Sequence, residues 1–215
     1  MQRPGEILAE RLRQAKVPRD YSAAFREFYD TAERHASEYM QEADIRVACG
    51  TCSFCCYQWV RVLAHEAFAI VDCISTMEPP RRQQVLEQLH SYHSDSHLLS
   101  PEDQDSFHRA CPLLIDGRCS VYPVRPSNCR RFHSLDSSHC QRSVEQPELW
   151  KDTPLHKGLA GAWSDMILAA DYSYHLTGHD QTTYNLAEAC LAALSNPALR
   201  RRWVQKKKAL LHDDS

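Results

Sequence analysis

Cysteine is the residue type in this sequence best suited to chemistry, and the spacing of the cysteines is regular. The 215-residue chain contains ten cysteines and twelve histidines. Two groups stand out: Cys49, Cys52, Cys55 and Cys56, and then Cys111, Cys119 and Cys129. A gap of two residues lets two thiolates reach one metal ion from a tight loop. Because buried cysteines that serve only as small hydrophobes have no reason to take this spacing, the pattern predicts a metal site.

The spacing fits zinc and iron–sulfur chemistry, and both stay open. A Cys-x2-Cys-x2-Cys run begins the ligand set of bacterial ferredoxins, whose remote cysteine precedes a proline, as Cys111 precedes Pro112 here. Eight thiols would suffice for two four-coordinate sites, and so would seven thiols with His133 or His139. The predicted thiol ligands are Cys49, Cys52, Cys55, Cys56, Cys111, Cys119, Cys129 and Cys140.

Arginines lie next to the last cysteine of the second group. A divalent ion held by four thiolates carries a net charge of −2, which cations and backbone N–H groups must offset. Arg125 and Arg130 could supply this positive charge, although ordinary salt-bridged surface arginines are an equal alternative. We expect both arginines, with His133 and His139, to lie close to the metal site.

A hairpin is expected where Asp116-Gly117 separates two short apolar runs. A two-residue turn would pair Leu114 with Cys119 and put Cys111 and Cys119 on opposite faces. A three-residue turn with a glycine bulge would put both thiols on one face. If the two cysteines share an ion, the bulged turn is expected.

Four motifs resemble the YkgJ-type cysteine-cluster family, which is described as zinc- or iron-chelating. They occur in the family's order over residues 49–132 as Cys49–Cys56, Cys111-Pro112-Leu113-Leu114, Gly117-Arg118-Cys119-Ser120-Val121-Tyr122 and Arg125–Phe132. The resemblance implies a metal or iron–sulfur centre on the seven cysteines of these motifs, and Glu66 also fits the family's habit. Cys140 lies beyond the motifs, so its ligand role is inferred from the residues alone. The family is similar to part of the flagellin lysine N-methylases, but no S-adenosylmethionine-binding motif is visible in this chain.

Other residue pairs carry weaker signals. His90, His93 and His97 would share a helix face and could bind a metal, although a solvated polar face is the more economical interpretation. Asp171 and His175 would also share a face, with His179 beyond them, but a helix break near Gly178 separates His179 from this pair. Cys73 and Cys190 lie on apolar helix faces and are expected in the core. The basic residues of segment 200–208 are expected on the solvated face of a docked helix.

Hydrophobic spacing predicts a mostly α fold, with helices near residues 6–15, 21–43, 65–77, 81–93, 156–176 and 186–194 and a last one reaching about Leu211. Residues 94–109 are expected to be a loop. We expect a single helical domain, 1–215, around a central cysteine-rich loop-and-hairpin metal-binding knuckle. Its parts would be the N-terminal helices (1–44), the cysteine-cluster region (45–140) and the C-terminal helices (155–211).

Composition narrows the function classes. The formal net charge is −3, so a polycation for nucleic acid is excluded, and six glycines without a Gly-rich run leave no phosphate-binding loop. No apolar h-region opens the chain and no apolar stretch could span a bilayer, so a cytoplasmic protein without a membrane segment is expected. In that compartment thiols stay reduced, which favours metal or redox chemistry over disulfides.

The sequence therefore predicts a metal-binding protein that holds zinc or an iron–sulfur cluster in a structural, accessory or redox role. Its partners would be the metal ion or cluster and, as a further candidate, a protein substrate. One alternative is an iron–sulfur-dependent enzyme, which requires a pocket beside the cysteines lined by His or carboxylates. A second is a thiol redox protein. Each metal hypothesis requires the thiols of the two groups to converge.

Overall fold

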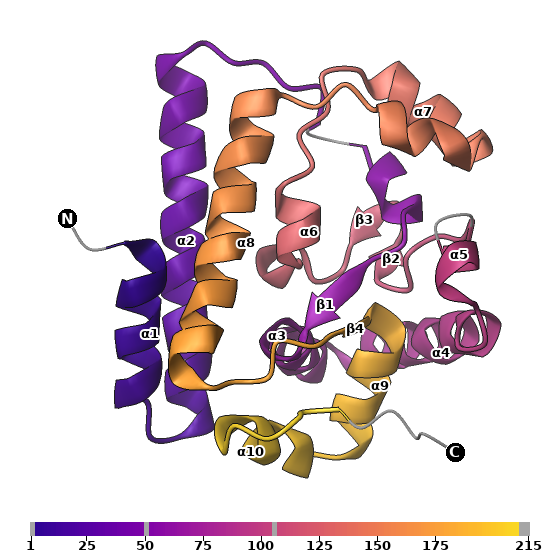
Figure 1. Cartoon of the computed structure of the whole chain (residues 1–215). Coiled ribbons are helices and arrows are strands. Elements are labelled where there is room, and N and C mark those ends of the chain that lie inside the picture. Colours follow the sequence, from indigo (N-terminus) through magenta and orange to yellow (C-terminus); the bar gives the residue numbers. More distant parts are fainter. Residues whose placement is uncertain (1–2, 50–51, 105–106, 211–215) are drawn as a thin grey trace.

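Helices make up most of the computed structural model, which describes residues 3–49, 52–104 and 107–210, so the mostly α prediction is confirmed. Three helices lie side by side on one flank of the molecule (Figure 1). They are α1 (Pro4–Gln14), α2 (Pro18–Glu42) and α8 (Lys157–Thr177). Both N-terminal helices begin with a proline, whose fixed φ suits the first helical turn.

The close packing of α1 against α8 depends on a glycine. A Cβ atom at Gly5 would lie 2.5 Å from the carbonyl oxygen of Ala169 and 3.2 Å from the ring of Tyr172. Only a residue without a side chain therefore lets the two backbones approach this closely.

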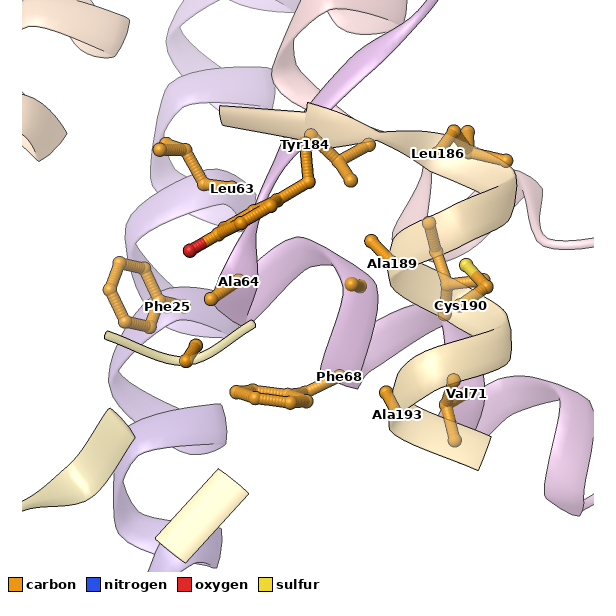
Figure 2. Close-up of a cluster of buried hydrophobic side chains, with 14 of the residues drawn as sticks. Phe25, Leu63, Ala64, Phe68, Val71, Tyr184, Leu186, Ala189, Cys190 and Ala193 are labelled. Carbon is orange, nitrogen blue, oxygen red and sulfur yellow. The ribbon is translucent and has the colours of Figure 1, made fainter. Parts of the chain in front are cut away.

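A second layer contains two helices joined to a short antiparallel ladder. Strand β1 (Arg61–Leu63) leads directly into α3 (Ala64–Ser75), and β4 (Thr183–Asn185) leads directly into α9 (Leu186–Ser195). The strands pair with Val62 opposite Tyr184. Figure 2 shows side chains of α3 and α9 facing each other, with Val71 next to Ala193. The ladder thus ties together segments about 120 residues apart.

The remaining elements are short except for α4, and they include the cysteine-rich part of the chain. They are η1 (Phe54–Tyr57), α4 (Pro79–Ser96), α5 (Pro101–Gln104), β2 (Leu114–Ile115), β3 (Arg118–Cys119), η2 (Tyr122–Val124), α6 (Ser127–Arg130), α7 (Ser137–Glu145), η3 (Pro147–Asp152) and α10 (Ala198–Val204). In Figure 1, η1, the hairpin and α7 lie on the side of α8 away from α1.

The six predicted helices before the last are found, with ends within a few residues of those expected. Two predictions need correction. The loop predicted at 94–109 contains the end of α4 and all of α5, although 105–106 lie outside the described residues. The last helix ends at Val204 rather than near Leu211, because Lys206 takes a positive φ; Leu211 itself is not among the described residues.

One hydrophobic core cluster runs from Leu8 to Leu210 and joins the N-terminal, cysteine-rich and C-terminal parts of the chain. Leu199 and Trp203 of α10, and Leu210 beyond its end, are buried in this cluster, so the last helix is docked on the core. Within the described ranges, no helix is both long and apolar enough to cross a membrane.

The end of α8 shows why His179 is not an exposed ligand. Gly178 takes φ 73° and closes the helix, as its sequence position predicts. The chain then turns inward, so His179 is buried against Trp203, at a ring distance of 4.6 Å, and its Nδ1 lies 2.7 Å from the Thr177 hydroxyl. Burial lowers the pKa of His179 to about 4, which keeps the ring neutral at pH 7.

Gly5→Ala is expected to lower the free energy of unfolding by about 1–3 kcal/mol, because the new methyl group must push α1 away from α8. Gly161→Ala is the matched control, since a Cβ there meets nothing within 4 Å, and it should stabilise the helix by about 0.5–1 kcal/mol. Urea unfolding of both variants measures the difference. Equal effects would contradict the close approach.

Stability should fall as the pH drops from about 6.5 to 4. In this range the unfolded chain protonates His179, whereas the folded ring stays neutral, so acid favours unfolding. In His179→Asn the amide nitrogen can keep the bond to Thr177, and the variant should lose about 2 kcal/mol less than the parent over this range. Urea unfolding at pH 7 and pH 4.5 measures both losses. Identical losses would mean that His179 is not held neutral.

Candidate metal centre

The cysteine-bearing segments lie against one another. The amide of Cys111 donates to the carbonyl of Cys56 at 2.6 Å, and the amide of Ala48 donates to the carbonyl of Ser134 at 2.8 Å. The amide of Ser134 also donates to the sulfur of Cys49 at 3.1 Å. Helix α7, which carries Cys140, packs against η1. These hydrogen bonds thus hold the first cysteine group between segments that are 55 to 86 residues further along the chain.

One set of neighbouring thiols contains Cys49, Cys52, Cys55 and Cys140. Burial raises the pKa of Cys49 to about 11, the Ser134 amide opposes this, and the nearby Cys55, Cys140 and Cys52 raise it further. Burial also raises the pKa of the buried Cys140, with smaller contributions from Cys52 and Cys55. Cys52 is exposed to solvent. The thiols of Cys49 and Cys140 therefore both lie within electrostatic range of Cys52 and Cys55.

A second set contains Cys111, Cys119 and Cys129. Burial raises the pKa of Cys111, and Cys129 and Cys119 raise it further. Burial likewise raises the pKa of Cys129, to which Cys55 and Cys119 add. The hairpin and α6 thus bring three thiols together beside η1.

Cys55 has neighbours in both sets. A hydrogen bond with the adjacent Cys56 raises its pKa most, followed by burial. Its thiol also raises the pKa of Cys49 and Cys140 in the first set and of Cys119 and Cys129 in the second. The thiols therefore form one connected network.

These residues fit a metal by their donor chemistry. All ten cysteines lie in the described part of the chain and none is in a disulfide, so every thiol is available. Thiolates are the soft donors that zinc and iron–sulfur clusters use. Among the described residues, no three His, Cys, Asp or Glu side chains yet surround one point closely enough to hold an ion. Binding would therefore draw the sulfurs closer together and release their protons.

The expected hairpin is present, and it has the two-residue turn, one of the two alternatives that the sequence left open. Leu114 pairs with Cys119 and Ile115 with Arg118, so the turn has two residues, and both take a positive φ. Cys111 is nevertheless a neighbour of Cys119. The reason is that Cys111 does not continue the strand: the amide of Leu114 donates to the Cys111 carbonyl in a tight turn at 2.9 Å. The alternation of side chains along β2 therefore does not fix the direction in which the Cys111 thiol points.

The two predicted arginines have different surroundings. Arg125 pairs with Glu33 at 2.8 Å, and its positive charge lowers the pKa of Cys55, Cys119 and Cys129 against the larger opposing effects. Arg130 is buried, pairs with Glu33 at 2.5 Å and donates to the carbonyl of Arg125 at 2.8 Å. Arg125 thus faces the thiols, whereas Arg130 supports the backbone that carries it.

The two predicted histidines are not equally placed for a role at the sulfurs. The Nε2 atom of His139 lies 3.0 Å from the carbonyl oxygen of Leu149, so the ring is bound to η3. His133 is half-buried, burial lowers its pKa, and its Nδ1 atom has no hydrogen-bond partner.

Sequence reasoning gave too little weight to Glu66, which is buried. One carboxylate oxygen accepts from the amide of Ser127 at 2.7 Å and from the Tyr29 hydroxyl at 3.3 Å, and the other accepts from the amide of Leu63 at 2.9 Å. Glu66 thus caps both α3 and α6, the helix of Cys129. Of these bonds, only the one to the Leu63 amide could have been predicted from the sequence, because residues 63 and 66 have the spacing of a capping box.

Cys73 was expected in the core and is only half-buried, although it packs against the core. It also lies near Cys119, whose pKa it raises slightly after the larger effect of burial. Cys190 is fully buried as predicted, and it is a neighbour of Cys111. No signal in the sequence separates these two cysteines, because both follow the same helical spacing.

The three histidines of α4 share one side of the helix, as their spacing predicts. His90 and His97 are exposed, and the rings of His93 and His97 are 5.2 Å apart. The Nδ1 atom of His97 is bonded to the carbonyls of His93 and Ser94, at 3.1 Å each. Within the described segments these rings do not form a three-donor group.

Glu66→Gln should lower the free energy of unfolding by about 1–3 kcal/mol, because an NH2 group would replace an oxygen that accepts from a buried donor. Asp72→Asn is the matched control on the same helix. Asp72 pairs with Arg200 at the surface, so its loss should cost about 1 kcal/mol or less. Denaturant unfolding compares them. A larger effect at Asp72 would contradict the role given to Glu66.

A comparison with protein families supports the resemblance seen in the motifs. The family model named CxxCxxCC, with the description "Putative zinc- or iron-chelating domain", matches residues 48–153. The match extends past the four motifs and includes Cys140. No curated protein and no solved structure matches the chain. Residues 48–153, just under half of the chain, are thus similar to the CxxCxxCC family, whose model is described as a "Putative zinc- or iron-chelating domain".

Proposed function

We propose that the protein holds zinc or an iron–sulfur cluster on thiolates of the connected network, in a structural or accessory role. The ligands would come from the eight cysteines of the two groups and α7, namely Cys49, Cys52, Cys55, Cys56, Cys111, Cys119, Cys129 and Cys140. The observation that carries the proposal is the position of Cys55, which has thiol neighbours from η1, the hairpin, α6 and α7.

The arrangement suits two four-thiol sites. Cys49, Cys52 and Cys140 form one electrostatically coupled set, and Cys111, Cys119 and Cys129 form another. Dividing the adjacent Cys55 and Cys56 between them would complete both sets. The elements that carry these thiols are short, so a metal that cross-links them would stabilise this part of the chain.

Positive charge beside the thiols supports the same conclusion. Thiolates around a divalent ion leave a net negative charge, which is costly in a partly buried site. Arg125 acts on three of the thiols, and Glu33 holds its guanidinium in place. We therefore assign Arg125 the role of offsetting the thiolate charge and Arg130 that of fixing its backbone.

Anaerobic purification followed by metal and sulfide analysis tests the proposal. Stoichiometric zinc in a colourless protein would support structural zinc sites, and iron with acid-labile sulfide in a brown protein would support a cluster. The enzyme alternative would be favoured by a cluster that is consumed or changed together with a substrate. A folded protein without metal, whose thiols oxidise reversibly in pairs, would favour a redox protein and contradict the proposal.

Cys129→Ser should remove at least one metal equivalent and lower solubility, because ligand loss leaves thiolates and loop backbone unsatisfied. Cys55→Ser should have the widest effect, since Cys55 borders both sets. The control is Cys73→Ala, which alters a half-buried thiol outside the predicted ligands and should keep the full metal content. Metal analysis of the purified variants is the measurement. Metal loss in Cys73→Ala with retention in Cys129→Ser would overturn the ligand assignment.

A further inference from the structure

A cavity lies on the side of the cysteine-rich segment that faces the helices. It has a volume of about 520 Å³ and is enclosed by α2, α3, α10 and residues 123–130. This volume is in the range of pockets that hold small molecules. A more open groove along α2 shares Arg26, Asp30 and Arg200 with the cavity and so connects it to the surface.

One wall of the cavity is aromatic. Trp203 of α10 is its centre, with ring centroids 5.6 Å from Tyr21, 6.1 Å from Phe25 and 6.2 Å from Phe68. The ring pairs are tilted or edge-to-face rather than stacked. Since flat apolar groups pack well against such surfaces, the wall favours a ligand that contains an aromatic ring.

The polar groups deepest in the wall are already bonded to one another. His65 lies between the hydroxyls of Tyr29, at 3.1 Å from Nε2, and Tyr174, which contacts Nδ1. Burial lowers the pKa of His65 to about 3, so the ring is neutral. The Tyr29 hydroxyl donates to Glu66, so His65 donates to Tyr29 and accepts from Tyr174. These groups leave little acceptor capacity for a ligand.

Hydrogen-bond donors, by contrast, remain available. The indole N–H of Trp203 is buried and has no hydrogen-bond partner in the part of the chain that the structure describes, although a buried donor of this kind ordinarily has one. Arg26 lines the mouth, and the ion pairs among the described residues include none with it. Of the other arginines that line the cavity, Arg125 and Arg130 pair with Glu33 and Arg200 pairs with Asp72, so Arg26 is the lining arginine for which the described residues show no ion pair. Asp30 is at the exposed mouth. A ligand would therefore have to supply acceptors and negative charge.

We propose that this cavity binds a small aromatic anion, with the ring against Trp203 and Phe68 and the anionic group toward Arg26 and the indole N–H. The site is distinct from the thiol network but adjoins it, because Cys73 and Arg125 line the cavity and both act on Cys119. A bound ligand would lie beside the predicted metal centre. The proposal holds whether or not the thiols bind metal.

The test uses the full chain and the fluorescent aromatic sulfonate 8-anilinonaphthalene-1-sulfonate. We expect saturable binding of one equivalent, displaced by indole-3-acetate but not by acetate, which has the charge without the ring. Ala69→Phe places a ring in the cavity and should abolish binding. Ala192→Phe, at a half-buried alanine of α9 outside the cavity, is the matched control and should bind as the parent does.

Two milder variants keep the test decisive if Ala69→Phe fails to fold. Trp203→Phe keeps a ring but removes the unpaired N–H, and it should weaken binding about fivefold. Arg26→Ala should weaken it about threefold, whereas Arg19→Ala, which alters an arginine of the open groove only, should leave it unchanged. Absence of binding, displacement by acetate as readily as by indole-3-acetate, or unchanged affinity in Trp203→Phe and Arg26→Ala would overturn the proposal.

Discussion

A single buried carboxylate fixes the relation between the helical part of the molecule and the cysteine-rich part. Glu66 accepts from the amides that begin α3 and α6 and from a hydroxyl on α2, so three elements are held by one side chain. A buried carboxylate is costly unless its oxygens are bonded, and here each oxygen has a donor. Since α6 carries Cys129 and Arg130, the position of Glu66 decides where the second set of thiols lies relative to the core.

A second ion-pair group complements this arrangement from the other side. Glu33 on α2 holds both Arg125 and Arg130, and the guanidinium of Arg130 lies 5.1 Å from the ring centre of Tyr29. Tyr29 in turn is bonded to Glu66. Charges of both signs, buried at Glu66 and Arg130 and half-buried at Glu33 and Arg125, thus alternate between α2, α3 and the segment 125–130. Removing one partner would leave the other charge unsatisfied, so the group specifies one position for the segment next to the thiols.

Local patterns in the sequence predict most of the helices and little of how they meet. The helical spacing of Tyr21, Phe25 and Phe28 and the stop at Gly178 are local signals, and the structure follows them. The β1–β4 ladder was not predicted, because each strand has three residues and its partner lies about 120 residues away. Proximity of Cys55 to Cys140 and to Cys129 depends on such long-range contacts. Ligand spacing therefore indicated a metal site, but only the fold shows which thiols are neighbours.

The central claim is that sulfur atoms of distant segments bind a common metal. X-ray absorption at the zinc and iron edges of the anaerobically purified full chain tests it most directly. The account predicts a coordination shell dominated by sulfur, at about 2.3 Å if the metal is zinc. A shell of oxygen and nitrogen atoms, or the lack of any bound metal in folded protein, would contradict it.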